Sequence, residues 1–117
     1  MTYVDGYLIP VPNKNRESYQ KMAAACAPIF KKHGALSVVE SWGDDVPEGK
    51  LTSFPMAVKL EEGESVVFSW ITWASKEARD AGNKAAMDDL HKMMDEKDVP
   101  FDGKRMIFGG FEAIVEA

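Results

Sequence analysis

Apolar residues recur along this chain with two different periods, one typical of strands and one typical of helices. Residues 4–11, 35–42, 65–73 and 106–115 are rich in β-branched and aromatic side chains and predict strands. After the first and third of these segments, apolar residues instead recur every three or four positions, which predicts amphipathic helices. The predicted order is therefore strand, helix, strand, strand, helix, strand.

The predicted helices also carry start and stop signals. Asn13 or Asn15 can cap the first helix, and Ser75 can cap the second, because a short side-chain oxygen accepts from free N–H groups there. Gly34 can end the first helix in the left-handed conformation. Two apolar faces result: Tyr19, Met22, Ala23, Cys26, Ile29, Phe30 and His33 on the first helix, and Ala78, Ala81, Ala85, Ala86, Leu90, Met93 and Met94 on the second.

The segment between the second and third strands, residues 43–63, is mostly polar. Within it, residues 54–60 are apolar enough to be ordered. Pro55 is compatible with either the start of a helix or an edge strand, so the pattern leaves both open.

This order fits a four-stranded antiparallel sheet with two helices on one face, the ferredoxin-like arrangement of the α+β class, in one domain spanning residues 1–117. Two helices cover only one face of such a sheet. In the third strand, however, both alternating sets of side chains are apolar: Val66, Phe68 and Trp70 on one side, Val67, Ile71 and Trp73 on the other. Because a solvated face would alternate with polar residues, we expect a second copy of the sheet to cover it in a homodimer.

Composition narrows the class of protein. The chain has 117 residues, a net charge of −5 and a pI near 5.0, so no basic nucleic-acid footprint is present and no nucleic-acid partner is expected. One cysteine excludes an internal disulfide and zinc sites built from several thiolates. No signal peptide and no run of 18 apolar residues is visible, so we expect a cytoplasmic protein without a membrane partner.

No motif for a bound cofactor is present. The chain lacks a P-loop, a dinucleotide glycine fingerprint, HExxH and GxSxG, so no cofactor is expected. His91 shares a helix face with Asp88 and Asp95, a spacing that could hold a divalent ion weakly. A solvated acidic face is the commoner meaning, and no metal site is predicted.

Three carboxylates stand among apolar strand residues: Asp5, Glu40 and Glu112. A carboxylate among aromatic rings can have its pKa raised toward neutrality and act as a general acid or base. If the strand faces coincide, the three line one wall with Trp42 and Trp70. Alternatively, each lies near a strand end and meets water or Arg105.

We predict a small-molecule pocket lined by Asp5, Tyr7, Glu40, Trp42 and Arg105. The period of two puts Asp5 and Tyr7 on one face of the first strand, and Glu40 and Trp42 on one face of the second. Arg105 could neutralise an acidic ligand, or it could pair with an acidic residue and stabilise its turn. The periodicity leaves open which faces of different strands meet.

Two smaller features carry expectations of their own. Gly109 and Gly110 interrupt the last strand, which predicts a bulge or the close approach of another backbone. Cys26 lies on an apolar helix face with no basic partner one turn away, which predicts a reduced, slowly reacting thiol.

Several segments resemble the YbaA-like family of small uncharacterised bacterial proteins: YVDGY, DVPEGK, VVFSW, SKEARDAGN and PFDGKRMIFGGFE. That family is similar to the dimeric α+β-barrel superfamily, which includes cofactor-independent monooxygenases, muconolactone isomerases, and haem-binding chlorite dismutases and peroxidases. The resemblance implies the homodimer but no particular reaction. The family pattern has a proline near Asp89 and Leu90, and its absence here favours an unbroken second helix.

These observations favour a protein that binds a small organic molecule in a pocket of a dimeric α+β barrel. A cofactor-independent monooxygenase- or isomerase-like enzyme is one alternative, and a noncatalytic assembly module with a filled core is another. Whether the protein is an enzyme stays open. A cavity that touches Asp5, Glu40 or Arg105 would favour ligand binding over the filled core.

Overall fold

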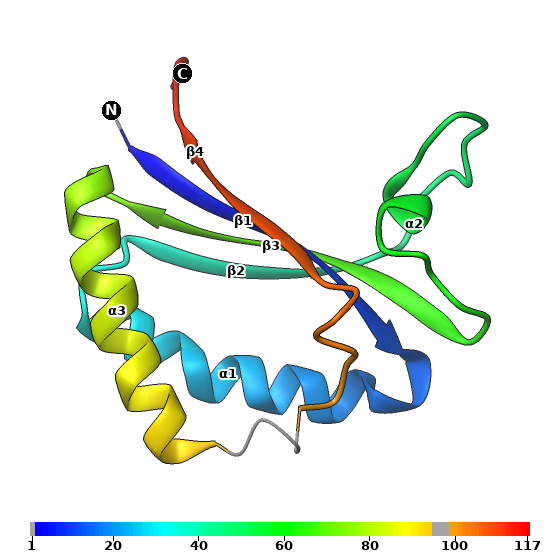
Figure 1. Ribbon diagram of the computed structural model, residues 1–117, viewed down its shortest axis with the longest axis horizontal. Coiled ribbons are helices and arrows are strands. Elements are labelled where there is room, and N and C mark those ends of the chain that lie inside the picture. Colours follow the sequence, from blue (N-terminus) through cyan, green and yellow to red (C-terminus); the bar gives the residue numbers. More distant parts are fainter. Residues whose placement is uncertain (1, 95–98) are drawn as a thin grey trace.

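The computed structural model describes residues 2–94 and 99–117. Its elements follow the predicted order along the chain (Figure 1). They are β1 (Tyr3–Pro12), a 3-10 turn (Asn13–Asn15), α1 (Arg16–Lys32), β2 (Ser37–Trp42), α2 (Phe54–Ala57), β3 (Glu64–Trp73), α3 (Lys76–Met93) and β4 (Ile107–Glu112). The segment left open between helix and strand is therefore a short helix. The last strand is shorter than predicted, because residues 113–115 lie outside β4.

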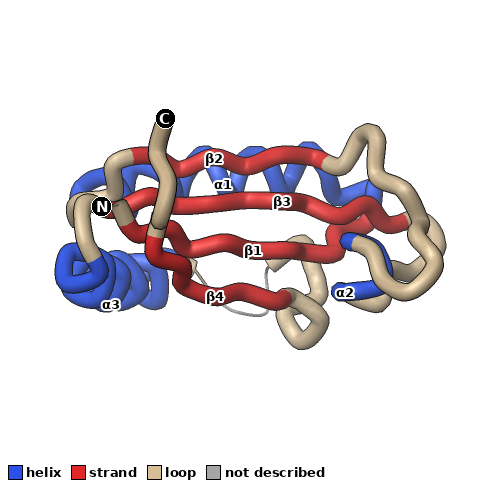
Figure 2. The backbone as a smooth tube through the Cα atoms, turned by 90° about the horizontal axis from the view of Figure 1, so that it is seen from above, coloured by secondary structure: helices blue, strands red, loops and turns tan. Residues whose placement is uncertain are grey.

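The four strands form one antiparallel sheet in the order β2-β3-β1-β4. Helices α1 and α3 lie on the same side of it, as the two views show (Figures 1 and 2). This arrangement confirms the predicted α+β, ferredoxin-like fold. Strand β1 lies inside the sheet, whereas β2 and β4 form its edges.

The strand register sorts the side chains into rows across the sheet. One row on the helix side runs through Phe108, Tyr7, Ser69 and Glu40, which pair successively across the four strands. The neighbouring row on the same side runs through Gly110, Asp5, Ile71 and Val38. Because side chains alternate along a strand, residues such as Phe68 and Trp70 point to the opposite face.

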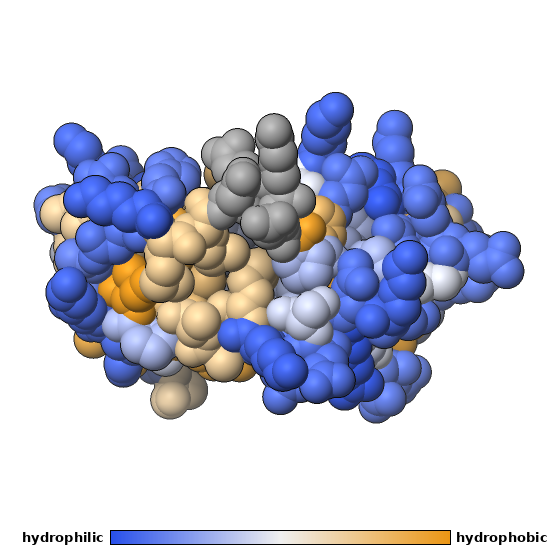
Figure 3. All heavy atoms as spheres, turned by 90° about the horizontal axis from the view of Figure 1, so that it is seen from below, coloured by the Kyte–Doolittle hydropathy of each residue, from blue (hydrophilic) through white to orange (hydrophobic). Residues whose placement is uncertain are grey.

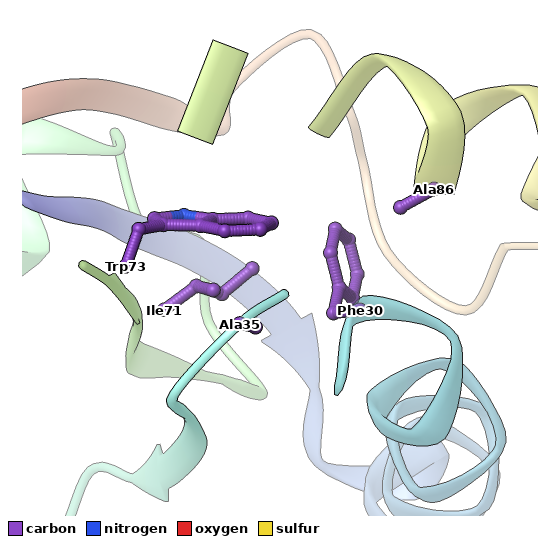
Figure 4. Packing of buried hydrophobic residues seen from close by; sticks show 5 residues of the cluster. All are labelled: Phe30, Ala35, Ile71, Trp73 and Ala86. Carbon is purple, nitrogen blue, oxygen red and sulfur yellow. The ribbon is translucent and has the colours of Figure 1, made fainter. Parts of the chain in front are cut away.

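The main core lies between the helices and one end of the sheet. Trp73 of β3 is fully buried, and its ring lies near Phe30 of α1 and Ala86 of α3 (Figure 4). Gly82 allows α3 to approach this closely, because a Cβ there would collide with the Trp73 ring and the His33 carbonyl. A second cluster centres on Val11, Tyr19 and Val67.

The opposite face of the sheet is open in the single chain (Figure 2). Phe68 is 45% exposed and Phe111 is 62% exposed on this face. Phe54 of α2 packs edge-on against Phe68 with ring centroids 5.9 Å apart and covers one end of the face. The predicted side of each β3 residue is therefore confirmed, and beyond the end that Phe54 covers, the apolar face stays open among the described residues.

Two capping and turn predictions have different outcomes. Ser75 caps α3, since its hydroxyl accepts from Ala78 N–H at 3.0 Å. Asn15 stands at the start of α1 without a side-chain cap, because its amide instead donates to the Pro100 carbonyl at 3.1 Å. Asn13 is likewise engaged elsewhere, accepting from the Ser65 hydroxyl.

The glycine pair of β4 forms no bulge, so that alternative is wrong, whereas the close approach of another backbone stays a prediction. Strand β4 pairs with β1 in unbroken register from Leu8–Ile107 to Tyr3–Glu112. Gly110 instead makes room for two side chains, because a Cβ there would collide with the Arg79 guanidinium and the Tyr3 ring. The predicted unbroken helix is confirmed, since α3 runs without interruption through Asp89 and Leu90.

No helix within residues 2–94 and 99–117 is long and apolar enough to cross a membrane.

Candidate functional site

A pocket of about 270 Å³, here called the inner pocket, lies between the sheet and the two long helices. Apolar side chains of β1, β3, α1 and α3 form nearly all of its wall, together with Phe101 and Met106 before β4. Its polar groups are few: Tyr7, Tyr19, Glu40, Ser69 and His91. An apolar concavity with a few converging polar groups is typical of small-molecule sites.

A second hollow of about 450 Å³, here called the edge groove, runs between α1 and the edge strand β2. Small residues of α1 leave this space, and the Arg16 guanidinium lies 5.1 Å from the centre of the Trp42 ring at one side. Seen from the helix side, apolar residues gather in the middle of the molecule between hydrophilic margins (Figure 3). The groove and the inner pocket share five lining residues: Tyr19, Ala23, Ala27, Val38 and Glu40.

Glu40 stands where the two hollows meet. The Tyr19 hydroxyl donates a hydrogen bond to Glu40 Oε1. One side of the Glu40 side chain is open to solvent through the groove, while the protein packed around its other side raises the pKa of the carboxyl. Hydrogen bonds from Tyr19 and Ser69 oppose that rise without cancelling it.

Two phenols flank this carboxylate. Burial raises the pKa of Tyr7 to about 12, and the negative charges of Asp5 and Glu40 add to the effect. Burial likewise raises the pKa of Tyr19, as does its hydrogen bond to Glu40. Both phenols therefore stay protonated at neutral pH and serve as hydrogen-bond donors.

Asp5 lies in the neighbouring row but has different partners. The Trp73 indole N–H donates to Asp5 Oδ2 at 3.0 Å, and Arg79 Nε lies 3.2 Å from Asp5 Oδ1. The same guanidinium lies over the Tyr3 ring, 4.8 Å from its centre. Burial raises the pKa of Asp5 even though Arg79 lowers it. Asp5 is thus enclosed by fixed partners.

Arg105 lies in a separate cluster before β4. Its guanidinium forms two bonds of 2.7 Å to the Glu64 carboxylate, one of 2.9 Å to Asp102 and one of 3.1 Å to the Lys59 carbonyl. These contacts hold the pKa of the Glu64 carboxyl below its usual range, chiefly through the hydrogen bonds from Arg105. Arg105 therefore stabilises the turn, which is the structural alternative considered above.

The chain has relatives among known proteins. A family described as a protein of unknown function, DUF1428, matches residues 2–103. The chain belongs to the DUF1428 family. The uncharacterized protein YbaA of Escherichia coli strain K12 is 54% identical over 116 residues, covering 99% of each chain. The protein of the same name from Shigella flexneri has the same identity and coverage. The predicted family is confirmed.

Two solved structures share the fold of this DUF1428 member. A mutant of MhuD, whose crystal structure holds two manganese protoporphyrin IX molecules per active site, has a TM-score of 0.64 at 18% identity, covering 98% of this chain and 97% of that one. Rv0793 from Mycobacterium tuberculosis has a TM-score of 0.55 at 12% identity, covering 100% and 99%. At these identities the likeness concerns the fold alone.

Of the five predicted site residues of this DUF1428 member, three line the two hollows and two do not. Asp5, Tyr7, Glu40 and Trp42 share the helix side of the sheet. Tyr7 lines the inner pocket, Trp42 lines the edge groove and Glu40 lines both. Among the described residues, Asp5 and Arg105 line neither hollow. The predicted condition that Asp5 and Glu40 project to the same side is met, but the structure does not bring Arg105 to them.

The wider set of aromatic and acidic residues is only partly brought together. Trp70 lies on the open face, opposite to Glu40, so it cannot share a wall with the strand carboxylates. Glu112 lies on the helix side but is exposed at the edge of the sheet. The predicted wall of three carboxylates and two tryptophans is therefore wrong as a whole.

The two histidines have different surroundings in the described structure. His33 ends α1, and its Nε2 lies 2.7 Å from Asp89 Oδ2 of α3. His91 lines the inner pocket. Asp95, which the sequence pattern placed on the same helix face as His91 and Asp88, lies outside the described residues. Residues 2–94 and 99–117 contain no group of three metal-ligating side chains.

The roles of Tyr19 and Ser69 were not predicted from the sequence. Tyr19 was assigned to the apolar face of the first helix and Ser69 to no site, and both prove to be buried next to Glu40. A signal for Tyr19 was available, because a buried tyrosine hydroxyl usually has a hydrogen-bond partner. Ser69 carried a similar signal as the hydroxyl-bearing residue of a buried strand face.

Proposed function

We propose that this protein binds a small, largely apolar organic molecule in the inner pocket, with Tyr7 and Glu40 among its contacts and Trp42 in the adjoining edge groove. The observation that carries the proposal is the pocket itself, about 270 Å³ of mostly apolar space that reaches a single carboxylate. Even a cavity of about 150 Å³ suffices to bind benzene. The fold supports the proposal, since the MhuD mutant of similar fold holds manganese protoporphyrin IX in its active site.

The pocket favours ligand binding over an assembly module with a filled core. Ala23 and Ala27 leave open space in the same layer that Trp73 fills toward the other end of the sheet. In a protein interior packed as densely as an organic crystal, such space is uncommon unless it is used.

The experiment is a binding assay with indole, phenol and toluene, read by melting temperature and by NMR shifts of pocket residues. A ligand that binds only the native state raises its stability, so the melting temperature should rise with concentration. Ala27→Leu fills the pocket and should abolish the shift. Ala25→Leu makes the same change at an exposed residue of α1 that does not line the pocket, and it should preserve the melting shift. Binding by Ala27→Leu equal to wild type would overturn the proposal.

A cofactor-independent enzyme is the second candidate, and Glu40 is the observation that favours it. A carboxyl with a raised pKa that is open to solvent and held by a phenol is suited to proton transfer. The test is to incubate a ligand found in the assay with wild type and Glu40→Gln and to follow it by NMR. Conversion by wild type alone would support the enzyme, whereas an unchanged ligand would favour binding without catalysis.

We further propose that the protein is a homodimer built on the open sheet face. The aromatic and aliphatic side chains of that face, including Phe68, Trp70 and Phe111, form an extended apolar surface that a second copy would bury. A stable interface of this kind buries more than about 1,200 Å² in total.

A cytoplasmic location remains a prediction of the sequence.

Light scattering at low micromolar concentration tests the dimer. Phe68→Asp should give a monomeric mass with an unchanged circular dichroism spectrum, because Phe68 is already half exposed in the protomer. Leu36→Asp changes a similarly exposed leucine just before β2 and should leave the dimer intact. A monomeric wild-type protein would refute this proposal.

A further inference from the structure

The carboxylate at the junction of the two hollows has only neutral partners. Its hydrogen bonds come from the hydroxyls of Tyr19 and Ser69. None of the ion pairs among residues 2–94 and 99–117 includes Glu40. Two carboxylates with little exposed surface, Asp5 and Glu64, each face an arginine instead.

A carboxylate in this position keeps unused acceptor capacity. An ionised carboxylate offers about four lone-pair sites, and two hydroxyl donors leave the others free. The position is also costly for the charge, since the surrounding protein displaces water on one side. A cation placed beside Glu40 would relieve that cost, as Arg79 does for Asp5.

Aromatic rings enclose the same space. Tyr7, Tyr19 and Phe101 line the inner pocket, and Tyr19 and Phe101 pack edge-on with centroids 5.9 Å apart. Trp42 lines the adjoining groove, but the Arg16 guanidinium already lies over its ring, so the rings that a ligand cation can meet are those of the inner pocket. Because the face of an aromatic ring attracts a cation, such rings around a carboxylate favour an ammonium group.

We propose that the ligand of the inner pocket is an organic ammonium compound, with its apolar part in the pocket and its ammonium group at Glu40. This inference rests on the proposed function and specifies its ligand class. An ammonium group supplies up to three donors to the free lone pairs of the carboxylate. The net charge of −5 draws cations toward the protein, whereas an anionic ligand would be repelled by Glu40.

The size of the pocket limits the apolar part. About 270 Å³ accommodates one aromatic ring with a short chain. Phenethylamine is therefore the probe, and two molecules of nearly the same shape serve as comparisons: phenethyl alcohol, which is neutral, and 3-phenylpropionate, which is an anion.

Binding of the three probes is measured by titration calorimetry at pH 7 with the full-length protein. Phenethylamine should bind about tenfold or more tightly than phenethyl alcohol, since a hydrogen bond to a charged partner is worth about 1.5–3 kcal/mol. In Glu40→Gln this preference should disappear, and binding of the alcohol should persist. Glu17→Gln removes the same charge from an exposed position on α1 and should keep the preference.

The outcomes separate this inference from the proposed function. Equal affinity of wild type for amine and alcohol, or an amine preference that survives Glu40→Gln, would overturn the ammonium ligand while leaving a ligand-binding pocket. Tighter binding of 3-phenylpropionate would overturn it as well. No binding of any probe, together with no melting shift from indole, phenol or toluene, would overturn both.

Discussion

Asp5 and Glu40 lie in neighbouring rows on the same face of one sheet, yet one is enclosed and the other is available. Asp5 belongs to an inner strand, where Trp73 and Arg79 occupy both carboxylate oxygens. Glu40 belongs to an edge strand, where two neutral hydroxyls bind it and a groove reaches it. The position across the sheet, rather than the residue type, decides which carboxylate can meet a ligand.

The helices above the sheet explain the difference. Over Asp5, the large ring of Trp73 and the long side chain of Arg79 fill the space, and Gly110 lets Arg79 lie across β4. Over Glu40, α1 presents Ala23 and Ala27, which are too small to close the gap to β2. One end of the layer is therefore a packed core and the other is a pocket.

The largest expected effect breaks the enclosed side. Arg79→Met leaves Asp5 buried without its cation while keeping much of the side-chain volume. Removing one partner of a buried ion pair costs about 3 kcal/mol in the free energy of unfolding. Urea denaturation measures it, with Lys84→Met on the exposed side of α3 as the control. A loss for Arg79→Met no greater than for Lys84→Met would show that Asp5 does not depend on this pair.

A smaller loss of stability is expected when the glycine that makes room for Arg79 is replaced. Gly110→Ala places a methyl group against the guanidinium and the Tyr3 ring, and overpacking of this kind costs about 1–3 kcal/mol. At Gly109 the same methyl group would meet only the Phe111 ring at 3.5 Å, an ordinary contact. Thermal unfolding of the two variants should therefore rank Gly110→Ala clearly below Gly109→Ala. Equal melting temperatures would contradict the close packing around Arg79.

Removing the charge of Glu40, on the side of the pocket, should not lower the free energy of unfolding, in contrast to the changes around Asp5. Because the pKa of Glu40 is raised on folding, its charge costs stability above the folded pKa, and stability is regained as the pH falls toward the unfolded value. Glu40→Gln should therefore unfold no more easily than wild type at pH 7. Tyr7 on β1 and Tyr19 and Cys26 on α1 have raised pKa values and stay protonated over this range.

Glu64→Gln is the matched comparison for that measurement. The pKa of Glu64 is lowered by Arg105, so its contribution is present above the unfolded pKa and is lost as the pH falls. Denaturation at pH 7 and pH 4 should show a loss for Glu64→Gln that shrinks at the lower pH. A larger loss for Glu40→Gln than for Glu64→Gln at pH 7 would reverse the comparison.

The smallest effect concerns the thiol beside the pocket. Cys26 is half buried, its Sγ lies 3.6 Å from Met94 Sδ, and burial raises its pKa. Modification by an aromatic disulfide reagent at pH 7 should be slower than in the unfolded chain, and phenethylamine should slow it further. Rapid modification of the native protein would mean that the wall around Cys26 opens readily.

Much of the fold follows from local pattern. Strand periodicity put Val67, Ile71 and Trp73 on one face and Phe68 on the other, as the structure has them. The cap at Ser75 was also predictable, because the capping contact spans only three residues. Asn15 was not, because Pro100, 85 residues away, binds its amide.

The sequence by itself determined the order of elements, the two sides of each strand and the four residues Asp5, Tyr7, Glu40 and Trp42 as candidates on alternating positions. These properties depend on contacts and periods within a few residues. Only the tertiary structure decided that Tyr19 binds Glu40, that Arg79 encloses Asp5 and that Arg105 pairs with Glu64. Such pairs join segments 21 to 74 residues apart, and strand register and helix packing, rather than local pattern, determine which side chains meet.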